Sequence, residues 1–492
     1  MFNINELGKY REGNRLEVKK AEKGLPHSLW PTYSAFANTN GGYILLGVEE
    51  LPDKSLHAIG LNNPEKWVSD FWSIANNSKK VNINILLDKH VRIEAVDGKQ
   101  IVVIEVPRAE RGFKPVFLDE KPYSETYRRD GEGDFRCTAQ IVEAMIRDKG
   151  ERTQDMLILE KMSLDVFDYG TLRSFRNRMR STRPGHVWDG LQDIEFLQKL
   201  GAINIGEDEK RHPTAAGLLM FGHEYEIVRE YHDYFLDYQE QFEAGVRFTD
   251  RITSNSGEWS GNVYDFFFKV YNKLSQHPKI KTPFKMEGII RVDDTPLHKA
   301  LREALANCLS NADFYGERGL VVRNRQDEIV IENPGGFRIE LSEAFSGGVS
   351  SPRNSVIMKM FTLLDIGERT GSGIPTICQA WQDEGFGKPK YTETFSPDRT
   401  ILSLAFAKTS EKSERKKRAK KPGETTKPTK GLVREQDIID FLADHKDVKT
   451  SEISENIDLS EGRVRFYLQR LIQKGMVVAD GETHNRIYRL KP

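Results

Sequence analysis

The sequence predicts an α/β (α+β) protein of several domains. Its 492 residues exceed the ordinary size of a single domain. Strand-sized apolar runs, such as residues 43–48 and 101–106, alternate with segments whose apolar residues recur at helical spacing. A basic, polar stretch over residues 408–430 separates a short C-terminal segment from the rest. Together these features favour separate α/β and helical domains joined in one chain.

Composition favours a soluble protein. Hydrophobic residues make up 38% of the chain and charged residues 30%, and no apolar run approaches the roughly 20 residues of a membrane helix. The N-terminus has no positive region followed by an apolar block, so we expect no secretory signal. Cys137, Cys308 and Cys378 are too far apart for a CxxC metal pair or a disulfide framework. We therefore expect a cytoplasmic, reduced protein that has no membrane partner.

Pattern changes along the chain predict five segments. Residues 1–150 combine the strand candidates 15–19, 43–48, 91–95 and 101–107 with helices over 27–38 and 138–149. The segments are an α/β domain (1–150), a helix-rich connecting domain with aromatic clusters (151–290), a second α/β domain (291–408), a linker (409–430) and a small C-terminal domain (431–492). We interpret the aromatic clusters YHDYFLDY and VYDFFFKVY as core.

The linker is strongly basic although the whole chain has a net charge of −1. Residues 408–430 contain ten Lys or Arg against three Glu and no aliphatic residue larger than Ala. This composition predicts a solvated, flexible tether. A supplementary role in binding nucleic-acid phosphates is an open alternative.

The C-terminal segment has the element order of a winged helix-turn-helix. Helices are predicted over 434–445, 450–456 and 460–475, followed by two strands around an Asp-Gly turn. This order resembles the winged-helix family, in which Arg463, Arg465 and His484 would face DNA from the recognition helix and the wing. A winged helix used only for protein contacts is the alternative, and the adjoining basic tether favours nucleic acid.

An acidic group near the N-terminus predicts a candidate catalytic site. The stretch SAFANTNGGYILLGVEE lacks the lysine and hydroxyl residue that a phosphate loop needs, and its glycines are expected to turn a helix sharply into a strand. That strand would deliver Glu49 and Glu50 toward Glu12, Glu17 and Lys19. Such carboxylates suit Mg²⁺ or Mn²⁺ and phosphodiester cleavage, with Glu12, Glu17 and Glu49 as ligands. Surface ion pairing is the plainer alternative.

Four motifs carry a family resemblance over residues 8–149. In order they are E-x4-E-x-K, SAFANTNGGYILLGVEE, VVIEVPRAERGFKPVF and YRRDGEGDFRCT. They resemble the Schlafen/Alba-type domain of bacterial proteins. In animal Schlafens this domain holds an endoribonuclease site of two glutamates and an aspartate, so Glu12 and Glu17 would fill the first two positions. The third falls within residues 47–50, where this chain has Glu in place of Asp, and the animal zinc ligands have no cysteine counterparts here. Many bacterial relatives are labelled as DNA-binding regulators.

A second group of motifs lies on a predicted helix and two glycine-rich loops. Glu303 and Asn307 are four residues apart and share one helix face. The Glu would activate a water molecule and the Asn oxygen would bind Mg²⁺, while loop N–H groups would hold phosphates.

The motifs EALAN, ENPGG, GGVSSPRN and ERTGSGI resemble the RecG-related C-terminal module of bacterial Schlafen/Alba proteins, over residues 296–406. That module is similar to the GHKL ATP-binding fold. The resemblance implies ATP as cofactor, with Glu303 as general base and Asn307 as the Mg²⁺ ligand. The other implied nucleotide-site residues are Asn333, Gly335, Gly336, Arg353, Gly371 and Gly373.

Three departures from these patterns limit the resemblance. Residues 332–335 read Glu-Asn-Pro-Gly in place of Asp-x-Gly-x-Gly, so the adenine-reading aspartate is missing or replaced. Residues 311–313 read Asn-Ala-Asp where relatives often carry His-Arg-Asp. No GxxxxGK[ST] or DExH-type box is present, so no helicase motor is expected.

These observations predict binding of nucleic acid (DNA or RNA) and of a nucleotide, and they leave two functions open. The first is a metal-dependent nuclease of the Schlafen type, acting in defence. The second is an ATP-responsive DNA-binding transcriptional regulator without catalysis. A module that has lost both activities within an assembly is the structural alternative. Dimerisation is common among GHKL proteins, so a homo-oligomer is expected by analogy.

Overall fold

The computed structural model describes most of the chain as two compact units, Met1–Thr409 and Ser410–Pro492. In the first unit it describes residues 7, 10–22, 24–243, 245–280, 286–287, 290–291, 295–367 and 371–407. In the second it describes residues 438–439, 441–442, 445, 448–457, 464, 467–468, 471–472, 477–480 and 487–490. Among these residues, no helix combines the length and the apolar character needed to cross a bilayer.

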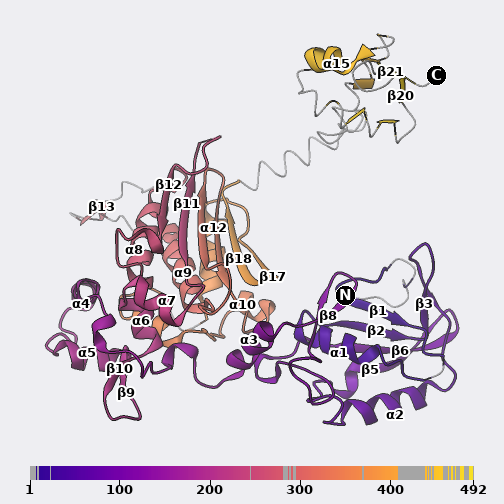
Figure 1. Cartoon of the computed structure of the whole chain (residues 1–492). Coiled ribbons are helices and arrows are strands. Elements are labelled where there is room, and N and C mark those ends of the chain that lie inside the picture. Colours follow the sequence, from indigo (N-terminus) through magenta and orange to yellow (C-terminus); the bar gives the residue numbers. More distant parts are fainter. Residues whose placement is uncertain are drawn as a thin grey trace. The chain divides into compact units, whose positions relative to one another are not determined.

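The N-terminal part of the first unit is built on a four-stranded sheet with the order β1-β2-β6-β5 (Figure 1). β1 runs parallel to β2, and the other neighbours are antiparallel. The strands are β1 (Leu16–Lys19), β2 (Gly42–Leu46), β5 (Val91–Val96) and β6 (Lys99–Val106). The helices of this part are α1 (Leu29–Asn38) and α2 (Pro64–Ala75). These elements confirm the four predicted strands and the predicted first helix, although β2 ends two residues before the predicted end of its strand.

Both faces of this sheet are buried, which explains the continuous apolar run in β2. Ile44 and Leu46 pack in one core with α1 and α2, whereas Leu45 packs on the other face with Leu16 and Val18. Successive residues of a strand point to opposite faces, so a strand with both faces covered reads as uninterrupted apolar sequence.

The stretch SAFANTNGG acts as a scaffold. The buried side chains of Ser34 and Asn38 donate to the carbonyl of Val116 at 2.7 and 2.8 Å, and Thr39 Oγ1 accepts from the N–H of Arg129. Gly41 has φ +65°, and a Cβ there would lie 2.7 Å from the carbonyl oxygen of Val106. The turn from α1 into β2 therefore needs a residue without a side chain at position 41.

Two hairpins and a helix complete the N-terminal part. At Gly47 (φ +85°) the chain leaves β2, earlier than predicted, and continues as a separate short strand. The added elements are β3 (Val48–Glu50), β4 (Leu56–Ala58), β7 (Tyr127–Asp130), β8 (Gly133–Arg136) and α3 (Ala139–Lys149).

A six-stranded sheet with the order β12-β11-β15-β16-β18-β17 forms the rest of the first unit together with its helices. Its strands are β11 (Leu236–Gln241), β12 (Asp250–Thr253), β15 (Leu320–Arg325), β16 (Glu328–Pro334), β17 (Lys390–Phe395) and β18 (Asp398–Ala405). The boundary predicted at residue 290 falls inside this unit, because β11 pairs in parallel with β15. Sequence-local patterns do not reveal a pairing between strands so far apart.

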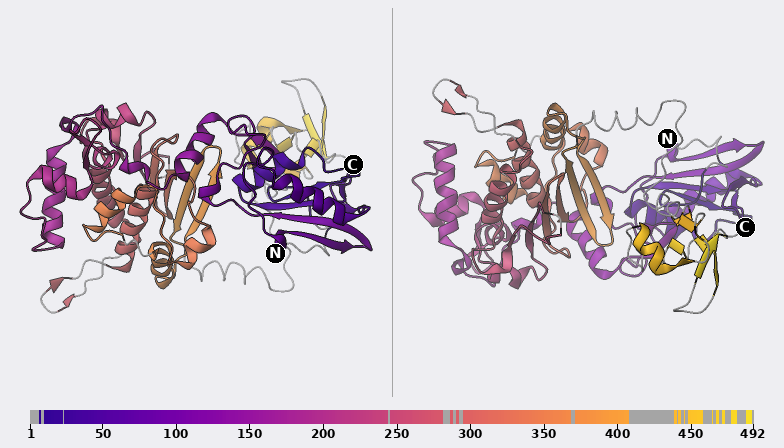
Figure 2. Two further views of the ribbon diagram at one scale, coloured as in Figure 1. Left: turned by 90° about the horizontal axis from the view of Figure 1, so that it is seen from below. Right: turned by 90° about the horizontal axis from the view of Figure 1, so that it is seen from above.

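Helices cover one face of this sheet (Figure 2), with α9 packed on β16 and flanked by α8 and α12. The helices here are α8 (Val263–Ser275), α9 (Pro296–Asn311), α10 (Leu341–Ser346), α11 (Ser355–Thr362) and α12 (Gly373–Asp383). The preceding connecting elements are α4 (Tyr169–Thr182), α5 (Asp193–Leu200), β9 (Ile203–Ile205), β10 (Arg211–Pro213), α6 (Ala215–Phe221) and α7 (Glu224–Glu230). A two-residue pair, β13 (Met286–Glu287) and β14 (Ile290–Arg291), precedes α9.

The aromatic clusters are core, as the sequence predicted. Tyr231, Tyr234 and Tyr238 are buried, as are Phe266 and Phe267, all in one cluster with α9 and the sheet. One core therefore joins the connecting helices to the six-stranded sheet.

The second unit has a three-stranded sheet with the order β19-β21-β20. Its described elements are β19 (Val448–Lys449), α15 (Thr450–Ile457), β20 (Val477–Asp480) and β21 (Ile487–Leu490). α15 and the hairpin of β20 and β21 confirm the prediction, and β19 is an additional strand. The core includes Val464, Leu468 and Leu471, residues at the spacing predicted for the third helix. Arg463, Arg465, His484 and the basic stretch 408–430 lie outside the described residues.

Candidate functional site

A cavity lies between α9, β16, β18 and the start of α12. It collects residues that are up to 99 positions apart in the sequence, from Glu303 to Leu402. Six of the eight predicted nucleotide-site residues line it, namely Glu303, Asn307, Asn333, Gly336, Gly371 and Gly373. Tyr391, Thr400 and Leu402 of the sheet floor also line the cavity, and no motif in the sequence marks them.

Helix α9 presents the two polar groups expected for a nucleotide site. Thr295 caps its N-terminus and Pro296 occupies its first turn, which fixes where the helix begins. Nδ2 of Asn307 donates to Oε1 of Glu303 at 3.0 Å, and no described residue donates to Oδ1 of Asn307. The amide oxygen thus remains a ligand atom of the kind that Mg²⁺ accepts.

The glycine loops approach α9 closely. A Cβ on Gly373 would overlap Oε1 of Glu303 and lie 2.7 Å from Nδ2 of Asn307. A Cβ on Gly371, which has φ +74°, would lie 2.5 Å from the N–H nitrogen of Val349. Backbone therefore lies where side chains would otherwise fill the cavity, which fits a phosphate-bearing ligand.

The turn after β16 is fixed by the sheet floor. Thr400 Oγ1 donates to the carbonyl of Gly335 at 2.9 Å, and Nδ2 of the buried Asn333 donates to the carbonyl of Pro334 at 3.0 Å. Asn333 lines the cavity, and the oxygen of its amide is an acceptor that can face a ligand there.

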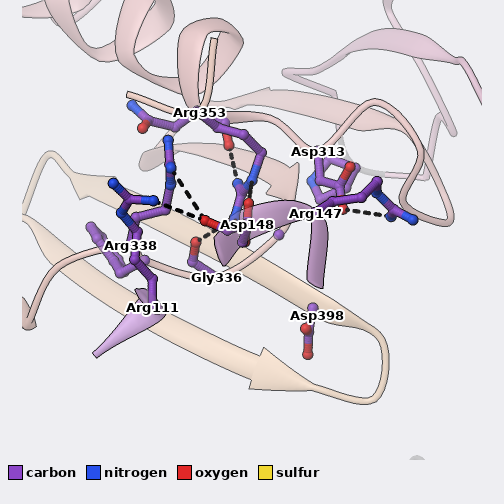
Figure 3. Close-up of polar contacts among 12 residues, drawn as sticks. Arg111, Arg147, Asp148, Asp313, Gly336, Arg338, Arg353 and Asp398 are labelled. Carbon is purple, nitrogen blue, oxygen red and sulfur yellow. Dashed lines mark hydrogen bonds and ion pairs between the residues drawn. The ribbon is translucent and has the colours of Figure 1, made fainter. Parts of the chain in front are cut away.

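Gly335 and Arg353, the other two predicted residues, lie beside a second cavity that shares the wall Gly336–Arg338 with the first. Arg353 is 3% exposed, and its Nε and Nη2 donate to the carboxylate of Asp148 at 2.9 and 2.7 Å. It also donates to the carbonyls of Asn311 and Gly336 (Figure 3). These bonds make Arg353 a bridge from the nucleotide cavity to α3.

Of the predicted acidic residues, Glu49 and Glu50 are neighbours in β3, and their side chains point to opposite faces of that strand. Glu12 lies near Glu17 and Glu50, and its Oε1 accepts from the N–H of Val18 at 2.9 Å. Glu49 instead forms an ion pair of 2.7 Å with Lys20. Alternation along the strand separates the two neighbours, so the structure brings Glu50 rather than Glu49 to Glu12.

Glu17 is held by two cations in a buried network. Lys19 Nζ donates to its Oε1 at 2.5 Å, and Arg129 Nη2 donates to its Oε2 at 2.7 Å. Arg129 also binds Asp134 and the carbonyl of Gly13. Arg129 lies within the motif YRRDGEGDFRCT, but the motif alone does not indicate that this residue binds Glu17.

The acidic cluster does not fit a metal ion as it is arranged. Within the described part of the chain, no group of three or more His, Cys, Asp or Glu side chains is placed to hold one. Glu50 nevertheless has a buried Oε1 without a hydrogen-bond partner among the described residues. Burial raises the pKa of Glu12, and the charges of Glu17 and Glu50 add to the rise. The carboxylates of Glu17 and Glu50 therefore repel that of Glu12 at neutral pH and disfavour its ionised form.

Glu12→Gln is expected to stabilise the protein at neutral pH. A carboxyl group whose pKa is raised by folding contributes stability below its unfolded pKa, about 4.3, and that contribution is lost as pH rises through the folded value. The variant should therefore melt a few degrees above the parent at pH 7.5 in EDTA, and the two should melt together near pH 4. Thermal unfolding followed by circular dichroism measures the difference.

Glu49→Gln is the matched control for Glu12→Gln. Its pKa is lowered by the hydrogen bond from Lys20, so the substitution removes a favourable ion pair and should leave the melting temperature unchanged or slightly lower. Equal melting temperatures of the parent and Glu12→Gln at pH 7.5 would show that the ionised form of Glu12 does not destabilise the folded protein.

The chain matches four protein families. Residues 12–138 match "Schlafen, AlbA_2", and residues 318–400 match "Putative ATP-dependent DNA helicase recG C-terminal". Residues 143–237 match a domain of unknown function (DUF8451), and residues 434–479 match "FaeA-like protein". A search of the curated proteins gave no match.

Two solved structures are similar to the chain. The DIP2311 protein from Corynebacterium diphtheriae shares 15% identity over 97% of this chain and 95% of its own, with a TM-score of 0.39. The N-terminal domain of a RecG-related protein from Nitrosomonas europaea shares 31% identity over 27% of this chain and 90% of its own, with a TM-score of 0.22.

The family matches cover the acidic cluster and most of the second candidate site. The acidic cluster lies within the first match, and Asn333, Gly335, Gly336, Arg353, Gly371 and Gly373 lie within the second, whereas Glu303 and Asn307 precede it. The chain therefore carries a Schlafen AlbA_2 domain at its N-terminus, a RecG-related ATPase-type domain in its second half and a FaeA-like segment near its C-terminus.

Proposed function

We propose that this is a nucleic-acid-binding protein that responds to ATP. The cavity on α9 binds ATP with Mg²⁺, and its occupancy changes how the AlbA_2 domain and the FaeA-like segment bind nucleic acid. The observation that supports this most is the convergence of six predicted nucleotide residues on one cavity. The Mg²⁺ ion, when bound, would neutralise phosphate charge beside Asn307.

Ion pairs support communication between the cavity and the AlbA_2 domain. Arg108 binds the carboxylate of Glu393 at 2.5 and 3.1 Å, and Glu393 also accepts from the N–H of Phe337 on the cavity wall. Arg128 binds Asp398 at 2.5 and 2.8 Å. These contacts, with Asp148 and Arg353, tie β17, β18 and the segment 337–353 to the domain proposed to bind nucleic acid.

Asn307→Ala is expected to weaken ATP·Mg²⁺ binding about tenfold or more, because it removes the amide oxygen offered to the ion. Isothermal titration of the full-length protein measures this. Asn177→Ala, on the exposed face of α4, is the control and should bind as the parent does. Fluorescence anisotropy of labelled duplex DNA and RNA, with and without ATP·Mg²⁺, should then show a nucleotide effect in the parent that Asn307→Ala loses. Absence of ATP binding by the parent would reject the proposal.

Cleavage of nucleic acid at the acidic cluster is a second candidate function. It is favoured by the raised pKa of Glu12 and by the Oε1 of Glu50, which has no partner among the described residues. A carboxyl group with a raised pKa can take a proton from the attacking hydroxyl or water, or give one to the leaving-group oxygen. Labelled tRNA, single-stranded DNA and duplex DNA would be incubated in EDTA, Mg²⁺ or Mn²⁺, with and without ATP. Any cleavage should disappear in Glu12→Gln and persist in Glu94→Gln, a surface carboxylate on β5. Full cleavage by Glu12→Gln would exclude this site.

A further inference from the structure

The second cavity lies between the AlbA_2 domain and the wall of the nucleotide cavity. It is bounded by the loop 108–114, the end of α3 and the segment 335–353. Six basic side chains line it, namely Arg108, Arg111, Lys114, Arg128, Arg338 and Arg353. None of the functions considered so far uses this space.

Three of the six cations are already neutralised and three are not. Arg108, Arg128 and Arg353 each bind a carboxylate through two nitrogens, those of Glu393, Asp398 and Asp148. The lining acids that remain, apart from Asp313 paired with Arg147, are exposed: Glu110, Glu340 and Glu343.

Arg111, Lys114 and Arg338 hydrogen-bond only to main-chain carbonyls among the described residues. Arg111 donates to the carbonyls of Asp148 and Gly150, and Arg338 donates to those of Pro352 and Asp148 (Figure 3). Lys114 Nζ donates to the carbonyl of Asn38 at 3.2 Å. Positive charge thus accumulates inside the cavity without an acidic partner at hydrogen-bond distance.

Two donors on the lining have no acceptor at all. Nε of Arg128 and Nε of Arg338 are buried and make no hydrogen bond to a described residue. Two lining arginines therefore carry a nitrogen whose charge no acceptor compensates, which adds to the positive character of the cavity wall.

The pKa of Lys114 also indicates that an anion is lacking beside it. The residue is partly exposed as a whole, but burial of its ammonium group lowers its pKa to about 7. The neighbouring cations Arg108 and Arg128 lower it further, against the smaller opposing effect of Glu393 and Asp398. An anion beside the ammonium would relieve this.

We propose that the second cavity binds a phosphate-bearing small ligand, whose oxygens accept hydrogen bonds from Lys114 and Arg338. Arginine and lysine donors converging on one site are the usual means of holding a phosphate. The ligand is either a separate phosphorylated molecule or the polyphosphate end of a nucleotide in the adjoining cavity. Such a ligand would bridge the AlbA_2 domain to the wall of the nucleotide site.

Titration of the full-length protein with pyrophosphate and with ATP·Mg²⁺ tests this proposal. Lys114→Met should weaken binding of at least one of the two by about tenfold or more, while Lys66→Met, exposed on α2, should bind as the parent does. Lys114→Gln repeats the measurement if the methionine variant does not fold.

The Asn307→Ala variant separates the two sources of phosphate. A separate ligand is indicated if pyrophosphate binds to Asn307→Ala as to the parent and is lost in Lys114→Met. The nucleotide's own phosphates are indicated if only ATP binding responds to Lys114→Met. The proposal is overturned if Lys114→Met and Lys114→Gln bind both compounds with parental affinity, or if the parent binds neither. Failure of Asn307→Ala alone to weaken ATP binding would count against the nucleotide site and not against this cavity.

Discussion

Replacing Asp148 by asparagine is expected to destabilise the first unit by about 3 kcal/mol, because it removes one partner of a buried ion pair. Arg353 is 3% exposed, and both oxygens of Asp148 accept from it. In the variant the guanidinium remains buried beside the carbonyls of Asn311 and Gly336. It loses the compensating negative charge and one of the two acceptor oxygens at position 148, where an NH2 group takes its place. Urea unfolding followed by intrinsic fluorescence measures the loss.

The effect of Asp148→Asn should depend on pH. Burial opposes ionisation of Asp148, but the charge and hydrogen bonds of Arg353 outweigh it and hold the pKa of Asp148 below its ordinary value. A carboxyl group whose pKa is lowered by folding contributes stability above its unfolded pKa, about 3.9, and that stability is lost as pH falls through the folded value. The difference between variant and parent should therefore be full at pH 7 and shrink in acid.

Asp119→Asn is the matched control for Asp148→Asn. Asp119 also accepts two bonds from one cation, Lys80, but its side chain is 42% exposed. Solvent-exposed pairs contribute about 0–1 kcal/mol, so this variant should be near parental in stability. Equal losses in the two variants would mean that burial does not distinguish the Asp148–Arg353 pair.

Local patterns were sufficient to predict the elements that carry the sites. The alternation in β1 and the helical spacing of Glu303 and Asn307 are properties of neighbouring residues, and both are found in the structure. The glycines near positions 41 and 371 were predicted as loop positions because few other residues tolerate a positive φ.

Long-range pairing explains what the sequence could not predict. The parallel contact of β11 with β15 joins Leu236 to Leu320, and no local pattern in the sequence marks this pairing. Asp148, the carboxylate partner of Arg353, lies 205 residues away in the sequence, so no motif reveals their ion pair. The chain leaves β2 at Gly47 and begins β3 in a new direction. Because of this change, the side chain near Glu12 is that of Glu50 and not that of Glu49.

Gly373→Ala is expected to lower ATP·Mg²⁺ affinity more than tenfold, because the added Cβ would overlap Oε1 of Glu303 and crowd Nδ2 of Asn307. Either α12 moves away from α9 or both polar side chains leave their positions, and each outcome disturbs the groups offered to the nucleotide. Forcing a methyl group into a packed contact costs about 1–3 kcal/mol, so a smaller loss of stability should accompany the loss of binding. Isothermal titration and urea unfolding on the same sample measure both.

Gly387→Ala shows whether the loss of binding follows from this contact. Gly387 lies beyond α12 in the same unit, has no positive φ, and a Cβ there would meet its nearest atom at 3.7 Å, an ordinary van der Waals distance. The control variant should therefore fold and bind ATP·Mg²⁺ as the parent does. Parental affinity in Gly373→Ala, with folding intact, would show that the Glu303–Asn307 face of α9 does not contact the nucleotide. Loss of affinity in Gly373→Ala alone would instead show that the cavity needs backbone, and not a side chain, beside these two residues.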